Sequence, residues 1–506
     1  MSNPSLKKVF SGSFWGIVAK VFDALAKFVT IPMLIGYFGK GDYGLFVLAF
    51  SLNAYLRLMD MGLNIGSIRY FSIWLAEGNT EKITKVSQSS VVFYGTIGIL
   101  NALIFAVMGH FAQELFHVSP DQAEIFTWMM YILSVSTVLN WTSYVVNQLL
   151  TAYDQLAWIN QMTMVSSFFN FFTAFLAVQL HLSLPVYFLL YILSTLLPIP
   201  LNVFRLRVTK LGLGTLLFPN WNFPAFKEIL SYSLSIFAMG LFQFTADNIR
   251  PILLASFASH GVEALSEYRV IQTICMLVIS FGSTFLQVLL PFSSKSISQK
   301  DDKKIHFLVY SGTKYISAFL SFIIFLLIVN AKVILILYVG EDFADLSPWL
   351  TIWLLSVLIQ MHTSPVASLI LSMGKTKPMV WSSALSCLVS IAVTVSLAPS
   401  YGVGAAVVAY FLYIVIQISF SYFYYVPYIL HFDAKKIFFS SFLPSALIGS
   451  TLAGVVHYFN LLYPFQSHYV TLFTNTSFYT ILFGIVILAV VVKPSELKNI
   501  RKQLSS

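Results

Sequence analysis

The sequence predicts an all-α polytopic membrane protein, and three observations support this fold class. Of the 506 residues, 58% are hydrophobic and only 10% are charged, whereas soluble domains carry about 25% charged residues. Mean hydropathy is +0.81. Apolar segments recur along the whole chain, each long enough to cross about 30 Å of hydrocarbon as a helix. They lack the alternating pattern of membrane β-strands, which excludes an outer-membrane barrel.

These apolar segments predict about 14 transmembrane helices. The expected spans are residues 12–36, 43–64, 86–108, 125–147, 160–180, 183–203, 231–256, 268–291, 307–329, 348–372, 378–398, 402–425, 439–459 and 473–492. The first span follows Lys7 and Lys8 and has no small-residue cleavage site behind it. We therefore interpret it as an uncleaved span and not as a signal peptide.

The basic residues set the predicted orientation. Of the 29 Lys and Arg residues, 21 fall in segments on the same side as the N-terminus, and only Lys40 and Lys332 fall on the other side. The positive-inside rule then places both termini in the cytoplasm. Because this rule accounts for the net charge of +9, we predict no nucleic-acid partner.

Two weak internal matches suggest a repeat. Residues 31–34 resemble residues 250–253, and residues 148–154 resemble residues 368–374, at nearly the same offset. An even number of spans in each repeat makes the repeats parallel. We predict two six-helix lobes in parallel repeat, followed by two C-terminal helices. The predicted domains are an N-terminal lobe at 1–210, a cytoplasmic linker at 211–230, a C-terminal lobe at 231–430, and two extra helices with a basic tail at 431–506.

The first span carries charged residues on one face. At 100° per residue, Lys20, Asp23 and Lys27 fall on one stripe about 80° wide, together with Ser13 and Gly16. If the three charges faced lipid, they would cost on the order of 8–10 kcal/mol. The stripe must therefore face protein or water inside the helix bundle.

Three other spans show similar polar stripes. The stripes consist of Asn53, Arg57, Asp60 and Asn64 in 43–64; Gln243, Asp247 and Arg250 in 231–256; and Tyr310, Lys314, Ser317 and Ser321 in 307–329. One interpretation is internal pairing at i,i+3 of Lys20 with Asp23, Arg57 with Asp60, and Asp247 with Arg250. Because four stripes occur, two in each half, we favour a water-filled cavity between two lobes.

The predicted cavity is net positive and suits an anionic substrate. Its candidate substrate-binding cations are Lys20, Lys27, Arg57, Arg250 and Lys314. Its acids are Asp23, Asp60 and Asp247, which either couple transport to a cation or balance the positive charge. Both alternatives stay open, because a nearby cation keeps a carboxylate ionised while burial favours its protonation.

No sequence motif indicates catalysis, a cofactor or a metal. Cys275 and Cys387 lie in apolar segments without a partner motif. The nine histidines form no metal-ligand spacing, and we interpret each, His362 included, as solvated or interfacial. Walker, phosphate-loop and HExxH motifs do not occur. We therefore predict a protein that is not an enzyme, binds no cofactor and contains no nucleotide motor.

Four short motifs carry a family resemblance. They are Gly36-Tyr37-Phe38-Gly39-Lys40-Gly41-Asp42-Tyr43-Gly44-Leu45, Leu58-Met59-Asp60-Met61-Gly62-Leu63, Gly374-Lys375-Thr376-Lys377 and Tyr401-Gly402-Val403-Gly404-Ala405-Ala406. In content and spacing they resemble the polysaccharide-biosynthesis (Wzx-like) flippases of the multidrug/oligosaccharidyl-lipid/polysaccharide exporter superfamily. The motifs are specific to this superfamily and not to one substrate.

The resemblance implies a function in the bacterial cytoplasmic (inner) membrane. The substrate would be an undecaprenyl-diphosphate-linked oligosaccharide, such as an O-antigen or capsule repeat unit, moved from the inner to the outer leaflet by alternating access. Membrane lipids, a glycan polymerase and chain-length machinery would be partners. Two alternatives are an H⁺- or Na⁺-coupled small-molecule exporter of the same superfamily and, with less support, a membrane glycosyltransferase or polymerase.

Overall fold

The computed structural model describes residues 4–116, 118–208, 213–373 and 377–490, and these residues form helices without any strand. Ten helices among them are long and apolar enough to cross a membrane. The chain is therefore a multi-pass, all-helical membrane protein, as predicted. Residues 374–376 of one motif and the basic tail at 491–506 lie outside the described residues.

The helices group into two compact units. Unit 1 comprises residues 1–266 with 398–402, and unit 2 comprises 267–397 with 403–506. The helices of unit 1 are α1 (Pro4–Leu56), η1 (Arg57–Asp60), α2 (Leu63–Ala76), α3 (Thr80–His110), α4 (Ala112–Phe116), α5 (Pro120–Ala152), α6 (Leu156–Gln179), α7 (Leu184–Leu196), α8 (Pro198–Val208), α9 (Leu213–Leu216) and α10 (Phe223–Phe257). The domain limits expected from the sequence stay a prediction.

The remaining helices belong wholly or mostly to unit 2. They are α11 (Glu263–Ser298), α12 (Asp302–His306), η2 (Phe307–Gly312), α13 (Thr313–Val329), α14 (Ala331–Val339), η3 (Glu341–Leu346), α15 (Ser347–Met361), α16 (Ser364–Met373), α17 (Lys377–Tyr401), α18 (Val403–Phe420), η4 (Ser421–Ile429), α19 (Ala434–Lys436), η5 (Ile437–Phe442), α20 (Leu443–Leu462) and α21 (His468–Val490). Only the first turn of α11 and the last residues of α17 are assigned to unit 1.

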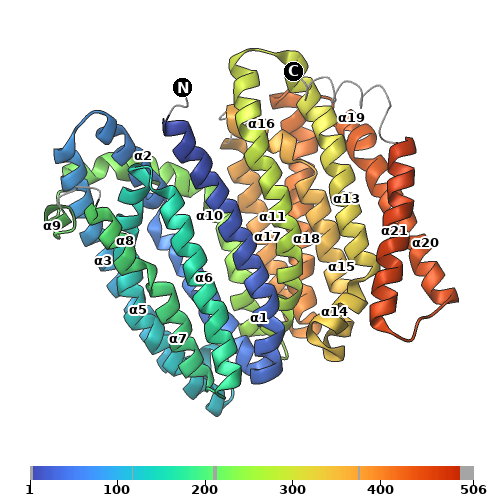
Figure 1. The fold of residues 1–506 in the computed structure, drawn as a ribbon, viewed down its shortest axis with the longest axis horizontal. Helices are drawn as coiled ribbons and strands as arrows, with labels where there is room; N and C mark the ends of the chain where they lie inside the picture. The colour runs from blue at the N-terminus through green and yellow to red at the C-terminus, as the bar shows by residue number, and fades with distance from the viewer. Residues whose placement is uncertain (1–3, 117, 209–212, 374–376, 491–506) are drawn as a thin grey trace. The chain divides into compact units, whose positions relative to one another are not determined.

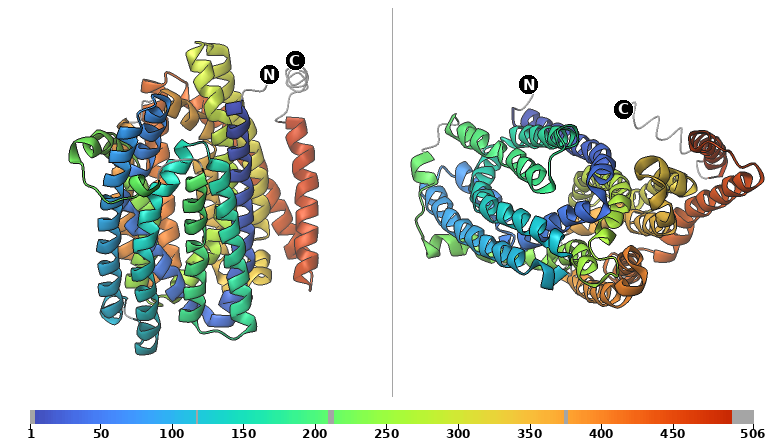
Figure 2. Two further views of the ribbon diagram at one scale, coloured as in Figure 1. Left: turned by 60° about the vertical axis from the view of Figure 1, so that its left-hand side comes forward. Right: turned by 90° about the horizontal axis from the view of Figure 1, so that it is seen from below.

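In unit 1, the long helices pack lengthwise. Helix α3 packs on α5, α1 packs on α6, and α7 packs on both α5 and α6 (Figures 1 and 2). Helix α10 contacts α1, α2 and α3. The core where α2, α3, α5 and α10 meet is aromatic, with Trp74, Tyr94, Trp141 and Phe226 buried in one cluster.

Polar residues at the helix starts satisfy backbone N–H groups that have no partner within the helix. The Asn79 side chain accepts from the Lys82 amide at the start of α3, and Ser119 does the same for Gln122 at the start of α5. Pro120 then occupies the first turn of α5, where a missing N–H costs nothing. Each helix thus begins where a local cap allows it.

The expected span 43–64 is not one helix, which corrects the sequence interpretation. Helix α1 is kinked at Gly39 and ends at Leu56; η1 is a 3₁₀ turn; and Met61 and Gly62 both have left-handed backbones, with φ of 50° and 73°. Such a conformation breaks a right-handed helix, and glycine adopts it without steric cost. The polar stripe predicted for residues 53–64 therefore does not form a single helical face.

In unit 2, α13 packs on α20 and α15, α15 packs on α18, and α20 packs on α21 (Figure 1). Three segments, η2, η4 and η5, are π-helical. They share a buried apolar cluster that includes Val309, Ile370, Tyr425 and Ile437. The expected span 348–372 is interrupted, because α15 ends at Met361 and α16 begins at Ser364.

Candidate functional site

The charged stripe of α1 contains an ion pair, but with a different partner from the one predicted. Lys27 Nζ lies 2.6 Å from Asp23 Oδ2, and Ser167 of α6 donates to Asp23 Oδ1 at 3.0 Å. The predicted Lys20–Asp23 pair is not formed, and Lys20 is exposed. Helical side chains lean toward the N-terminus, so Lys27 reaches back one turn to Asp23. An acid followed by a lysine four residues later is also the favourable order.

Asp60 accepts two hydrogen bonds at the helix break. Its Oδ1 accepts from the Tyr94 hydroxyl of α3 at 2.7 Å, and its Oδ2 accepts from the Asn64 amide in the first turn of α2 at 3.2 Å. Gln148 of α5 donates to the same Tyr94 oxygen at 2.7 Å. The predicted Arg57–Asp60 pair is absent although both residues are described, and Arg57 is exposed. Asp60 therefore links α2, α3 and α5.

Two glycines let α2 approach α10 closely. A Cβ atom at Gly62 would lie 2.5 Å from the Ser233 carbonyl oxygen, and one at Gly66 would clash with the Ser233 hydroxyl. Gly62 is also required by its positive φ. The Asp60-Met61-Gly62 motif thus has a structural function, since it ends one helix, begins the next and fits it against α10.

The predicted i,i+3 pair on α10 is confirmed. Arg250 Nη1 lies 3.4 Å from Asp247 Oδ1, with the arginine side chain only 3% exposed and the aspartate side chain 47% exposed. Pairing and hydrogen bonding are what make a guanidinium tolerable in such a buried position. This pair lies in unit 1, as do Lys20, Lys27 and Arg57.

Lys314 is in unit 2, near the start of α13. It is half-buried, and its Nζ lies 5.8 Å from the centre of the Tyr315 ring. Ser317 and Ser321, one and two turns further along, are buried in the bundle. The common cavity for all five candidate cations remains a prediction.

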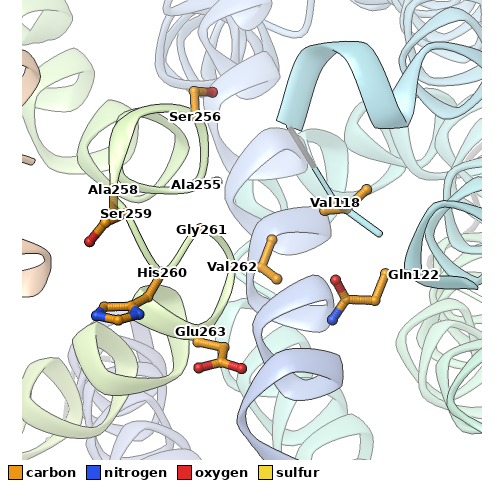
Figure 3. A pocket seen from close by; sticks show the side chains of 10 residues that line it. All are labelled: Val118, Gln122, Ala255, Ser256, Ala258, Ser259, His260, Gly261, Val262 and Glu263. Carbon is orange, nitrogen blue, oxygen red and sulfur yellow. The ribbon is translucent and has the colours of Figure 1, made fainter. Parts of the chain in front are cut away.

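Two pockets of unit 1 lie away from these cations. One has a volume of about 400 Å³ and is lined by Gln122 of α5, by Glu263 of α11 and by the preceding loop with His260 (Figure 3). The other, of about 500 Å³, includes Asp42 and Glu124. Burial raises the pKa of the Asp42 carboxyl. Both pockets carry carboxylates, so neither resembles the predicted anion site.

Reasoning from charge missed the uncharged polar partners. Tyr94, Gln148 and Ser167 hold the acids of unit 1 in place, yet none of them carries a charge. His362 was also misinterpreted, because it is completely buried in unit 2 and is not solvated. Its position inside the expected span 348–372 was the one available signal. Within the described residues, no group of three His, Cys, Asp or Glu side chains could hold a metal ion.

Comparison with known proteins gives one family match and several similar folds. Residues 9–297 match the family described as polysaccharide biosynthesis protein. The fold is similar to that of the lipid II flippase MurJ in an inward closed conformation, with a TM-score of 0.71 and 14% identity, covering 94% of this chain and 99% of that chain. No curated protein sequence matches the chain.

Two further solved structures have the same fold. An inward-facing multidrug resistance MATE family transporter of the MOP superfamily has a TM-score of 0.62 and 13% identity, covering 85% of this chain and 95% of that chain. A MOP superfamily transporter from Pyrococcus furiosus has a TM-score of 0.56 and 11% identity, covering 90% and 97%. At these identities the similarity shows the fold alone.

Proposed function

The chain belongs to the polysaccharide biosynthesis protein family, and we propose that it moves a polyprenyl-diphosphate-linked oligosaccharide between the leaflets of the bacterial cytoplasmic membrane. The O-antigen or capsule repeat unit is the substrate class, and the direction is from the inner to the outer leaflet. The family match over residues 9–297 is the observation that carries this proposal. A lipid-linked substrate also agrees with the similarity of the fold to a lipid II flippase.

Charged residues inside membrane helices support an anionic substrate. Unit 1 keeps Lys27 and Arg250 on α1 and α10, each beside one carboxylate. A charged side chain inside a membrane span is expensive and typically marks a site that binds or moves a substrate or ion. In the proposal, Lys20, Lys27, Arg57, Arg250 and Lys314 hold the diphosphate in turn while the polyprenyl tail stays in lipid.

The Lys27–Asp23 pair can release its lysine for this purpose. The two side chains are 44% and 35% exposed, and exposed pairs contribute at most about 1 kcal/mol. A diphosphate offers more negative charge and more acceptor oxygens than one carboxylate. Exchange of Asp23 for the substrate is therefore energetically accessible, while Ser167 keeps a hydrogen bond to the displaced carboxylate.

The proposal includes the finer architecture expected from the sequence. It has fourteen spans, two six-helix lobes and two extra helices, with both termini in the cytoplasm and transport by rocking of the lobes. It includes no enzymatic activity and no cofactor. Glycan polymerase and chain-length machinery are the proposed protein partners.

Reconstitution tests the function directly. The purified full-length protein is placed in liposomes with a fluorescent undecaprenyl-diphosphate-linked oligosaccharide, and the fraction reached by a membrane-impermeant quencher is followed over time. We expect exchange between leaflets to be faster than in protein-free liposomes. Suppose instead that leaflet exchange is equally fast with and without the protein, and that the same liposomes export small organic cations. These results would refute the flippase proposal and favour a small-molecule exporter.

A further inference from the structure

A fully buried histidine lies at a helix break inside unit 2. His362 follows the last residue of α15, and α16 begins two residues later. His362 directly follows the apolar segment Glu341–Met361, which is long enough to cross a membrane, and its side chain is 0% exposed.

The His362 ring contacts Tyr422 and Phe442. Its Nε2 lies 2.7 Å from the Tyr422 hydroxyl, and the ring stacks on Phe442 with centroids 4.0 Å apart. The ring also interacts with the backbone of Leu358 and Ile359 in the last turn of α15, although its Nδ1 makes no hydrogen bond of good geometry.

Three π-helical segments lie near His362 or its helix break. Tyr422 belongs to π-helical η4 and Phe442 to π-helical η5. Pro365 of α16 packs on Gly312, the last residue of π-helical η2. Such segments are uncommon and occur frequently at functional sites, where a helix changes register or bends.

Among the described residues, no ion pair or hydrogen bond brings a carboxylate to this ring. Tyr422 is the titratable group in hydrogen-bond contact with the ring. The other titratable groups on η2, η4 and α13 are Tyr310, Tyr424, Tyr425, Tyr428, Lys314 and Tyr315. An imidazolium without a counter-charge is strongly disfavoured in such an interior. His362 is therefore neutral in this conformation.

We propose that His362 is a proton-binding site that couples the conformation of unit 2 to pH. The biological purpose of such a site rests on the proposed transport function. Its test does not, because it needs no transport. When the α15–α16 break opens to water, a hydrated imidazole binds a proton from solvent between about pH 6 and 7. The carbonyl ends of α15 favour the cation at that position. Burial of the ring then requires the proton to leave again.

The sign of the coupling follows from this cycle. Low pH stabilises the opened conformation, since only the hydrated ring carries the charge. Neutral or high pH stabilises the buried ring seen here. The pH of the compartment to which the α15–α16 break opens would therefore set the balance between the opened and the buried conformation of unit 2.

Hydrogen–deuterium exchange of the full-length protein in nanodiscs tests the site without any substrate. After correction for intrinsic rates, peptides covering 358–366 and 420–430 should exchange at least about tenfold faster at pH 5.5 than at pH 8. His362→Gln should abolish this difference. The matched control His457→Gln replaces an exposed histidine of α20 and should behave as wild type. The same pH difference in His362→Gln and wild type would overturn the proposal.

A second variant covers the case in which His362→Gln does not fold. Tyr422→Phe keeps the ring size and removes a hydrogen bond made only in the buried state. Its exchange transition should move to higher pH by roughly half a unit to one unit. An unmoved transition would also overturn the proton site. Failure of the liposome assay with wild type would refute the transport function instead, which keeps the two results separate.

Discussion

Replacing Lys27 by alanine separates the stability of the Lys27–Asp23 pair from its proposed function in binding. Both side chains are partly exposed, and in the proposed water-filled cavity water screens the pair, so its loss costs at most about 1 kcal/mol. Asp23 keeps the Ser167 hydroxyl as a donor. For a chain of this size, Tm should fall by no more than about 2 °C.

The effect of Lys27→Ala on transport should be much larger. A charge-assisted hydrogen bond from an ammonium to phosphate is worth about 1.5–3 kcal/mol. If Lys27 makes it when the substrate crosses, the leaflet-exchange rate should fall roughly 10- to 150-fold. Lys27→Arg keeps the positive charge but changes its geometry, so partial activity should remain.

The assay is the liposome measurement of leaflet exchange, run beside a thermal melt of each variant. Lys332→Ala is the matched control, because Lys332 is exposed and lies outside every predicted stripe. Normal exchange in Lys27→Ala with a normal melt would refute a diphosphate-binding function for this lysine. A large fall in Tm would refute the estimate that the pair is only weakly stabilising.

Three further substitutions test the packing of unit 1. Gly66→Ala should destabilise the protein by about 1–3 kcal/mol, because the added methyl group meets the Ser233 hydroxyl. Adding Ser233→Ala to the same chain should restore part of the lost stability, as measured by a thermal melt. Tyr94→Phe should cost about 1–3 kcal/mol by removing the donor to Asp60; an unchanged Tm would contradict this function. Gly44→Ala should lower Tm as well, since its Cβ would clash with a backbone carbonyl; wild-type stability would mean that this contact relaxes at no cost.

The sequence by itself determined the class of the protein and its local electrostatics. Hydropathy and segment length predicted a multi-pass helical membrane protein, because the bilayer admits few other backbones. Helical spacing placed Asp247 beside Arg250, and the structure confirms that pair. Spacing also placed Asp23 on the same face as Lys27, although the assumed partner Lys20 was wrong. Contacts within one helical turn are predictable because they depend only on the helical period.

Tertiary structure alone decided which polar groups meet across helices. Asp60 and Tyr94 are 34 residues apart, and His362 and Tyr422 are 60 residues apart, so no local period relates either pair. The helix break after Leu56 could not be predicted from the local pattern either, because it depends on contacts between helices. The left-handed backbone at Met61 carries a local conformational cost. The hydrogen bond of Asp60 with Tyr94 and the close fit of Gly62 and Gly66 against α10 help to offset that cost, and these contacts form when the helices pack.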